Sequence, residues 1–118
     1  LNLNASPFHE NKLGQRKELL CRQASESNIP IVYVNLIGGQ DELVFDGGSM
    51  VIDHNGECAV NAPEYESGLY PVDFNCEHGC KPVPQELHPE LSLEKRVYNA
   101  LVLGVRDYVN KNGFKSIV

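Results

Sequence analysis

Two residues near the start of the chain, Ser6 and Lys12, have side chains suited to holding a small polar ligand. Ser6 follows an expected strand end and precedes an expected helix, so it could offer a hydroxyl and backbone N–H groups. Lys12, one turn into that helix, could meet a carboxylate. From spacing alone, a serine that serves the turn and a lysine on the surface are the more ordinary interpretation.

A second polar group, Gln40, Asp41 and Glu42, stands between two apolar runs. These side chains could orient a substrate amine or clamp a neighbouring loop, because sites are often built where buried strands end. The alternative is an exposed polar loop with no ligand, which the sequence alone favours.

The four cysteines, Cys21, Cys58, Cys76 and Cys80, do not form a catalytic or metal-binding pattern. The stretch CEHGC could be half of a zinc site, but its ligands are crowded and structural zinc sites normally use two well-spaced pairs. We therefore expect no metal. Cys21 falls on an expected helix and Cys58 on an expected strand, which is typical of packing residues. No neighbouring base or cation marks any of the four as a nucleophile.

Composition excludes several classes of protein. The 118 residues carry a net charge of −6, and 42% are hydrophobic, which is a globular balance. Nucleic-acid binding is not expected, because no basic patch is present to pair with phosphates. No apolar run approaches the roughly 20 residues that span a membrane. Cysteines outside a disulfide framework indicate reduced thiols and the cytoplasm.

The first third of the chain has the pattern of a strand, a helix and a strand. Leu1–Asn4 is an expected strand, a helix runs from about Glu10 to about Ser27, and Ile31–Asn35 begins the next strand. The two strands are therefore expected to be parallel neighbours with a right-handed crossover. The residues expected on the buried face of the helix are Leu13, Leu20 and Ala24, and those expected largely on its wet face are Lys12, Gln15, Arg16, Glu18 and Glu26.

Short apolar runs and glycines in the middle of the chain predict an antiparallel extension of this layer. Gly47-Gly48 suggests a bulge or a close backbone approach, and Asn55-Gly56 is a strong hairpin signal. The expected strands are Ile31–Ile37, Leu43–Phe45 continuing through Met50–Ile52, about Glu57–Ala62, and one near Gly68–Phe74, with Gly38–Glu42 as a loop.

The character of the chain changes after Phe74. Residues 75–89 are rich in proline and read as a linker. An amphipathic helix is then expected over about Ser92 to Asn112, ended by Gly113 in a left-handed conformation, and Phe114–Val118 is expected to begin a strand. Because the chain opens and closes inside apolar segments, we expect it to be a piece of a larger protein.

Three stretches, LNLNASPFH, PIVYVNLIGGQDELVFDGGS and YNALVLGVRDYVNKNGFKSIV, resemble the glutamine-dependent NAD synthetases. The resemblance covers essentially the whole chain and implies an α/β fold: part of a nitrilase-like α-β-β-α sandwich followed by a helix and strand of a second α/β domain. It implies that residues 1–74 are the C-terminal part of a glutaminase domain, residues 75–90 a linker, and residues 91–118 the start of an ATP-dependent synthetase domain.

The resemblance also implies a division of labour. The family's nucleophilic Cys, its Glu base and its Lys lie upstream of a segment like this one, and its ATP-binding loop lies downstream, so no catalytic residue is expected here. Ser6 and Lys12 match positions that contact glutamine, and Gln40, Asp41 and Glu42 become a wall or interface loop. The implied enzyme is a homo-oligomeric ligase that uses ATP, Mg²⁺ and glutamine-derived ammonia to convert nicotinic acid adenine dinucleotide into NAD.

Two alternatives stay open. Another amidase of the nitrilase superfamily would share the strand order but would not need residues 91–118. A non-catalytic assembly fragment is the other, since the chain lacks every catalytic group that the resemblance implies.

Overall fold

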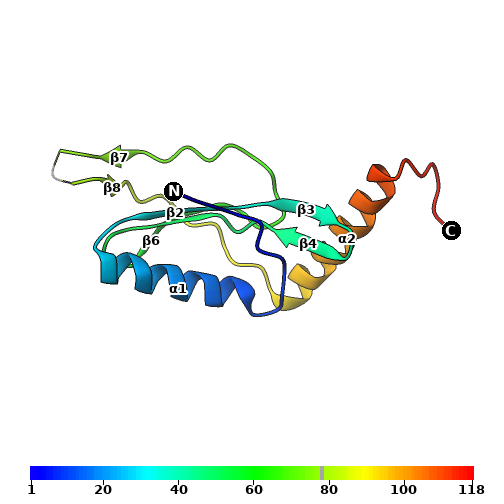
Figure 1. Ribbon diagram of the computed structural model, residues 1–118, viewed down its shortest axis with the longest axis horizontal. Helices are drawn as coiled ribbons and strands as arrows, with labels where there is room; N and C mark the ends of the chain where they lie inside the picture. The colour runs from blue at the N-terminus through cyan, green and yellow to red at the C-terminus, as the bar shows by residue number, and fades with distance from the viewer. Residues whose placement is uncertain (78) are drawn as a thin grey trace.

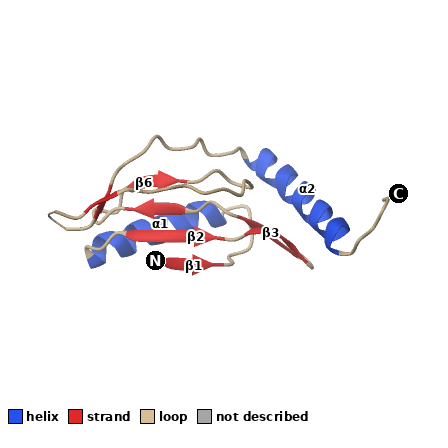
Figure 2. Cartoon of the chain, turned by 90° about the horizontal axis from the view of Figure 1, so that it is seen from above, coloured by secondary structure: helices blue, strands red, loops and turns tan. Residues whose placement is uncertain are grey.

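A four-stranded sheet with helix α1 on one face forms the body of the computed structural model, which describes residues 1–77 and 79–118 (Figure 1). The molecule is elongated, with extents of 58 × 25 × 22 Å. The sheet has the strand order β1-β2-β5-β6. Figure 2 shows its strands side by side from above, with α2 extending beyond them. The bounds are Asn2–Asn4 for β1, Lys12–Ser27 for α1, Ile31–Asn35 for β2, Met50–Ile52 for β5 and Cys58–Asn61 for β6.

The strand–helix–strand unit predicted at the start of the chain is confirmed. Strands β1 and β2 pair in parallel, with Asn2 opposite Tyr33. Helix α1 begins two residues later than predicted and ends at Ser27. Asn28 adopts a left-handed φ of 52° and its N–H bonds to carbonyls of the last turn, so it stops the helix.

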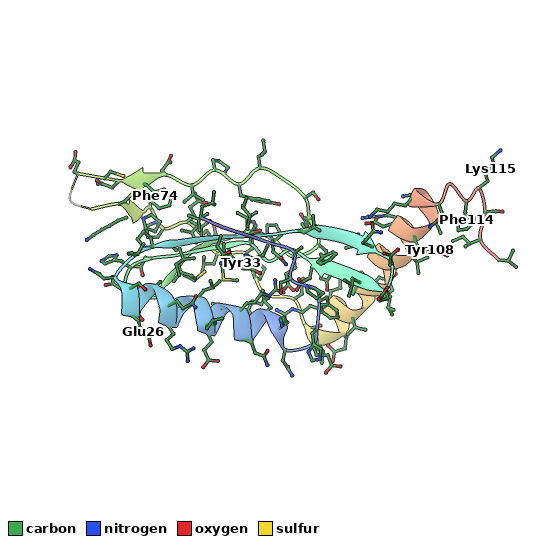
Figure 3. The ribbon with its side chains drawn as sticks, viewed as in Figure 1. Glu26, Tyr33, Phe74, Tyr108, Phe114 and Lys115 are labelled. Carbon is green, nitrogen blue, oxygen red and sulfur yellow. The ribbon has the colours of Figure 1, made fainter. Side chains whose placement is uncertain are left out.

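The main core lies between α1 and the sheet. Leu13, Leu20 and Ala24 face the buried side chains of Tyr33, Met50 and Ile52. Each large apolar side chain buried here contributes about 1.5–3 kcal/mol to stability. Figure 3 shows Tyr33 within this body of the molecule, while Glu26 points out into solvent from the end of α1.

The second half of the sheet is antiparallel, as predicted. β5 pairs with β2 and with β6, and the register shifts between Val51 and Ile52. The turn between β5 and β6 is held by Asp53, whose Oδ1 accepts from the N–H groups of Asn55 and Glu57 at 2.9 and 2.8 Å. Gly56 has a φ of 87°, and a Cβ there would lie 2.6 Å from the Cys21 carbonyl oxygen. A side chain at this position is therefore excluded by both conformation and space.

The run predicted as one strand over Ile31–Ile37 divides at Leu36. Beyond it, β3 (Ile37–Gln40) and β4 (Leu43–Asp46) form a separate hairpin, so Gly38 and Gly39 belong to a strand and not to the predicted loop. The turn is reduced to Asp41 and Glu42, with Asp41 at a left-handed φ of 51°. The nearly continuous apolar run Ile31–Ile37 gives no sign of the break at Leu36. Gly38 and Gly39 were predicted as a loop because glycines in a paired strand resemble a loop in sequence.

The strand predicted near Gly68–Phe74 is wrong for all but its last residue. Residues 66–73 run without strand pairing along the face of the sheet opposite α1, and only Phe74 enters β7 (Phe74–Asn75). Pro71 cannot donate to a ladder, which is consistent with an unpaired segment. β7 pairs with β8 (Lys81–Pro82) in a short hairpin that begins at Phe74 and continues into the predicted linker.

Helix α2 (Leu93–Lys111) has nearly the predicted bounds. The Ser92 hydroxyl accepts from the Lys95 N–H at 3.3 Å as an N-cap, and Gly113 is left-handed at φ 69°. Its repeating apolar face is exposed, with Leu101 65% and Val105 55% accessible. The predicted strand at 114–118 is wrong, because no partner strand lies beside it within the described residues. Among the residues that the structure describes, no helix has the length and apolar character to cross a membrane.

Candidate substrate-binding site

The loop that carries Ser6 leaves the carboxyl end of β1 and is fixed to the carboxyl end of β2. The Ser6 N–H donates to Asn35 Oδ1 at 2.8 Å, and Asn35 Nδ2 donates to the Ser6 carbonyl at 3.1 Å. Farther along, the Phe8 N–H donates to the Val44 carbonyl at 2.7 Å. Ligands in α/β sheets bind at the carboxyl ends of parallel strands, and this loop lies at such an end.

Asn35 is the centre of a buried polar network. Besides Ser6, its Nδ2 reaches the Gly47 carbonyl at 2.9 Å and Asp46 Oδ1 at 3.4 Å, and its N–H donates to Ser49 Oγ at 3.0 Å. The side chain is only 6% exposed. Because buried polar groups are costly when unpaired, each of these bonds restricts where the Ser6 loop lies.

Arg16 and Asp46 form a buried ion pair next to Asn35. Arg16 Nη2 lies 2.8 and 2.7 Å from the two Asp46 carboxylate oxygens, and its Nη1 donates to the Gly47 carbonyl at 3.2 Å. Burial by itself would lower the pKa of Arg16. The hydrogen bonds and charge of Asp46 outweigh this effect and raise the pKa. The pair joins α1, β4 and, through Asn35, the Ser6 loop.

The prediction that Arg16 lies on the wet face of the helix is wrong. Arg16 lies three residues after Leu13 and four before Leu20, on the same stripe, and is 7% exposed. A lone charge inside an apolar stripe was the available signal. Its partner Asp46, at the end of an apolar run, could not be paired with it from sequence because 30 residues separate the two.

Tyr65 borders the network on a further side. Its N–H donates to the Asp46 carbonyl at 2.9 Å. The centroid of its ring lies 6.3 Å from the centroid of the Phe8 ring. Its φ of 63° is strained for a residue with a large side chain. Its hydroxyl is buried without a hydrogen-bond partner among the described residues, and burial raises the pKa of Tyr65. Nothing in the sequence marked this residue.

The two predicted ligand contacts, Ser6 and Lys12, are half-buried. Lys12 is the first residue of α1, and its N–H donates to the His9 carbonyl at 3.0 Å. Within the described residues, neither the Ser6 hydroxyl nor the Lys12 ammonium makes a hydrogen bond or an ion pair. Neither residue lines any of five cavities formed by the described residues.

A hollow on the sheet lies on the face away from α1. Its volume is about 540 Å³. Its walls include Val32, Val34, Val51 and Val60 of the sheet, and Val72 of residues 66–73, which cross this face and are called the crossing segment. These walls are mostly apolar and carry no cluster of titratable groups. Such a face is typical of a surface that packs against another protein layer.

The tip of the β3–β4 hairpin, which contains Gln40, Asp41 and Glu42, contacts helix α2. Lys111 Nζ donates to the Gly39 carbonyl at 2.6 Å and to Gln40 Oε1 at 3.0 Å. Asp41 and Glu42 are exposed and make no side-chain hydrogen bond to any described residue. Among the described residues, Gln40 therefore contacts helix α2 and not a neighbouring loop, and the proposed role of this group beside a substrate stays a prediction.

A carboxylate on α2 completes this contact. Asp107 Oδ2 accepts from the Gly39 N–H at 2.8 Å, and this hydrogen bond is the main reason that the pKa of Asp107 is lowered. Nearer the start of the helix, Arg96 Nε lies 2.8 Å from Glu64 Oε2. Glu64 is buried, with 9% of its surface exposed. Helix α2 is thus held by polar contacts at both of its ends.

Cys76 and Cys80 lie next to one another, with their Sγ atoms 2.9 Å apart. His78, the third residue of the possible zinc motif, lies outside the described residues. Among the residues that are described, no three His, Cys, Asp or Glu side chains are grouped as metal ligands would be.

Comparison with known proteins identifies the relatives of this chain. It is 37% identical to the glutamine-dependent NAD⁺ synthetase of Acinetobacter baylyi over 118 residues, which is all of this chain and 22% of that protein. It is 39% identical to that of Xylella fastidiosa over 115 residues, or 97% of the chain and 21% of the relative. Over its whole length the chain is similar to one segment of glutamine-dependent NAD⁺ synthetases. It spans about a fifth of the length of these curated relatives. No protein-family model matches.

Solved structures agree with this similarity to the synthetases. The structure of the Acinetobacter baumannii glutamine-dependent NAD⁺ synthetase with adenosine diphosphate matches 99% of this chain, at a TM-score of 0.90 and 36% identity, over 23% of its own length. A carbon-nitrogen hydrolase from Helicobacter pylori matches 97% of the chain at a TM-score of 0.51 and 16% identity, over 40% of its length, which shows the fold alone.

These findings confirm the resemblance to the synthetases and the partial nitrilase-like α/β fold predicted from the sequence. The relatives are ligases, as predicted. The division into residues 1–74, 75–90 and 91–118, and the ligand contacts of Ser6 and Lys12, stay predictions.

Proposed function

We propose that this chain serves in a glutamine-dependent NAD⁺ synthetase and that Ser6 and Lys12 hold the substrate glutamine. The similarity over the whole chain to synthetases, together with the TM-score of 0.90, is the observation that carries this proposal. In it, residues 1–74 belong to the glutaminase domain, residues 75–90 are the linker and residues 91–118 start the synthetase domain.

The buried network supports the role of Ser6. Two hydrogen bonds from Asn35 fix the Ser6 backbone, while the Ser6 hydroxyl makes no bond to any described residue. This arrangement suits a binding loop, because a loop whose backbone is already fixed loses little conformational entropy when a ligand binds to its free hydroxyl.

Lys12 supplies the complementary charge. Its ammonium has no acidic partner among the described residues, and it is half-buried at the start of α1, after the loop that carries Ser6. Glutamine carries a free α-carboxylate, which a lysine recognises as a point charge. A charge-assisted contact of this kind contributes about 1.5–3 kcal/mol.

Bond breaking belongs, in this proposal, to groups outside residues 1–118. A thiolate there attacks the glutamine carboxamide and releases ammonia, which the synthetase domain uses with ATP and Mg²⁺ to amidate nicotinic acid adenine dinucleotide. We assign none of this chain's residues to ATP or Mg²⁺. The proposal also includes that the enzyme is cytoplasmic and homo-oligomeric.

The test compares two nitrogen donors in the full-length protein. Lys12→Ala should raise the KM for glutamine roughly 10- to 100-fold, the equivalent of the lost contact. Synthesis from free ammonia should stay unchanged, because ammonia bypasses the glutamine site. Steady-state kinetics with each donor measure both effects.

Lys17→Ala is the matched control, since Lys17 lies on the same helix and its ammonium pairs with Glu90 at the surface. Its glutamine KM should match that of the unaltered protein. Equal loss of activity with both donors in Lys12→Ala would contradict the proposed contact. The 118-residue chain alone should show no glutaminase activity above background, and real turnover would mean that it contains a nucleophile.

A further inference from the structure

The two exposed cysteines on the β7–β8 hairpin form a pair that the proposed function does not use. The Sγ atoms of Cys76 and Cys80 are 2.9 Å apart. Both residues are exposed, so small reagents reach them from solvent. Figure 1 shows the hairpin at the end of the molecule opposite α2.

The register of the hairpin places the two cysteines directly opposite each other. Phe74 pairs with Pro82 and Asn75 with Lys81, so the same register continued by one residue sets Cys76 opposite Cys80. Hydrogen-bonded and non-hydrogen-bonded pairs alternate along such a ladder. Since Pro82 has no N–H, its pair with Phe74 is non-hydrogen-bonded, and the Cys76–Cys80 pair two positions on is of the same kind.

That kind of pair suits a disulfide. Non-hydrogen-bonded partners have Cα atoms about 4.5 Å apart, inside the range of about 4.4–6.8 Å that disulfides occupy. The backbone therefore does not have to move when the two sulfurs bond. Gly79 has a φ of 99°, a left-handed conformation that glycine adopts without steric cost.

The other two cysteines differ in burial and in the groups they contact. Cys21 and Cys58 are half-buried, and burial is the main reason that the pKa of each thiol is raised. The Cys58 thiol donates to the Val60 carbonyl at 3.5 Å. These two should remain thiols under conditions that oxidise the exposed pair.

We propose that Cys76 and Cys80 are a reversible dithiol site that forms an intramolecular disulfide by exchange with a low-molecular-weight disulfide such as oxidised glutathione. One thiolate attacks a sulfur of the reagent, forms a mixed disulfide and releases one reduced thiol. The second thiolate then attacks the protein sulfur of that mixed disulfide and releases the other. In sum, two protein thiols and one oxidised reagent give one protein disulfide and two reduced thiols.

The bond would fasten a segment that packs on the core. Phe74 lies at the start of the hairpin (Figure 3). It packs with Val72 against the cluster of Val51, Ala59 and Val60. Crosslinking the far end of the hairpin holds Phe74 in register with Pro82. The redox state of the pair thus controls how firmly the crossing segment lies on this face of the sheet.

Glu-C endoproteinase makes the test direct, because it cuts after Glu77, between the two cysteines. The protein is equilibrated with glutathione redox buffers, quenched by acid, alkylated, digested and analysed by mass spectrometry. We expect peptides 67–77 and 78–86 to remain joined and to lack two hydrogens, with Cys21 and Cys58 alkylated. They should separate after reduction.

Two variants complete the test. Cys80→Ser should retain a glutathionyl group on Cys76, about tenfold more than the unaltered protein, because the fast second exchange is lost. Cys58→Ser, the control, should form the 76–80 disulfide normally. Separate peptides with glutathione kept on Cys76 or Cys80 of the unaltered protein would overturn the proposal, as would a disulfide that joins Cys76 or Cys80 to Cys58.

Discussion

Asn35 and Ser6 hold each other by two reciprocal hydrogen bonds, from the Ser6 N–H to Asn35 Oδ1 at 2.8 Å and from Asn35 Nδ2 to the Ser6 carbonyl at 3.1 Å. A side chain on β2 here replaces the backbone partner that a strand would supply. The loop that carries the proposed glutamine contact is therefore positioned by an amide that itself depends on Asp46 and Gly47.

Asn35→Ala should destabilise the protein by about 1–3 kcal/mol, because it leaves buried groups of the Ser6 loop and Gly47 without partners. It should also raise the glutamine KM in the full-length protein while ammonia-dependent synthesis is unchanged. Urea denaturation and kinetics with each nitrogen donor measure the two effects.

The control is Asn61→Ala. Asn61 makes the same reciprocal pair with the His88 backbone, at 2.9 and 2.8 Å, but at the surface. There water replaces the lost hydrogen bonds, so Asn61→Ala should destabilise the protein less than Asn35→Ala does. The KM for glutamine should stay unchanged. Equal costs for the two variants would argue against a buried network around Ser6.

The Arg16–Asp46 pair should show strong energetic coupling. Asp46→Ala leaves a buried guanidinium unpaired and should cost about 3–5 kcal/mol. Replacing both residues by apolar ones, Arg16→Met with Asp46→Leu, should cost less than the single change, because no buried charge remains. Urea denaturation of Arg16→Met, Asp46→Leu and the double variant closes a double-mutant cycle and gives the coupling energy.

The pair of Lys17 and Glu90 provides the comparison for this cycle. Their side chains are 41% and 55% exposed, and the coupling between them should stay below about 1 kcal/mol. If the double replacement at positions 16 and 46 were as costly as Asp46→Ala, the interaction would not be the source of the loss.

Sequence patterns predicted those elements whose periodicity reflects a single buried face. Helix α1 and the parallel pairing of β1 and β2 followed from such patterns, as did the Asn55-Gly56 turn. The two strands predicted near 68–74 and 114–118 failed because a strand needs a partner, and short β-branched or aromatic runs do not reveal whether one is present.

The site could be predicted only in part, for a related reason. Residue type and position indicate Ser6 and Lys12 as candidates, but only the resemblance to a family favours a glutamine contact over a turn serine and a surface lysine. The residues that fix the Ser6 loop come from three distant segments, and Arg16 was placed in solvent because charged residues usually lie there. Its bond to Asp46 is a tertiary contact, which local periodicity does not encode.

Helix α2 packs closely on the β3–β4 hairpin, so Gly39→Ala should be costly. A Cβ at position 39 would lie 3.1 Å from Gly104 Cα and 3.3 Å from Asp107 Cβ, both on α2. Overpacking of this kind costs about 1–3 kcal/mol. Gly14→Ala is the matched control, since no atom lies within 4 Å of its Cβ position on α1. That change should stabilise the protein by about 0.5–1 kcal/mol. Thermal unfolding of both variants checks the two signs, and a stable Gly39→Ala would mean that α2 does not lie against the hairpin.

The same contact should make the protein sensitive to acid. The pKa of Asp107 is lowered, chiefly by the hydrogen bond from the Gly39 N–H, with smaller effects of Arg106 and Lys111. A carboxylate with a depressed folded-state pKa stabilises the fold above its unfolded pKa of about 3.9, and that stabilisation is lost as the pH falls through the folded-state value. Asp107→Asn removes the titrating group but keeps an oxygen that accepts from Gly39. The variant should therefore lose less stability than the unaltered protein between about pH 5 and pH 2. Urea midpoints of both proteins measured across this range test the prediction. If the two midpoints fell equally as the pH is lowered, Asp107 would not be ionised against the hairpin.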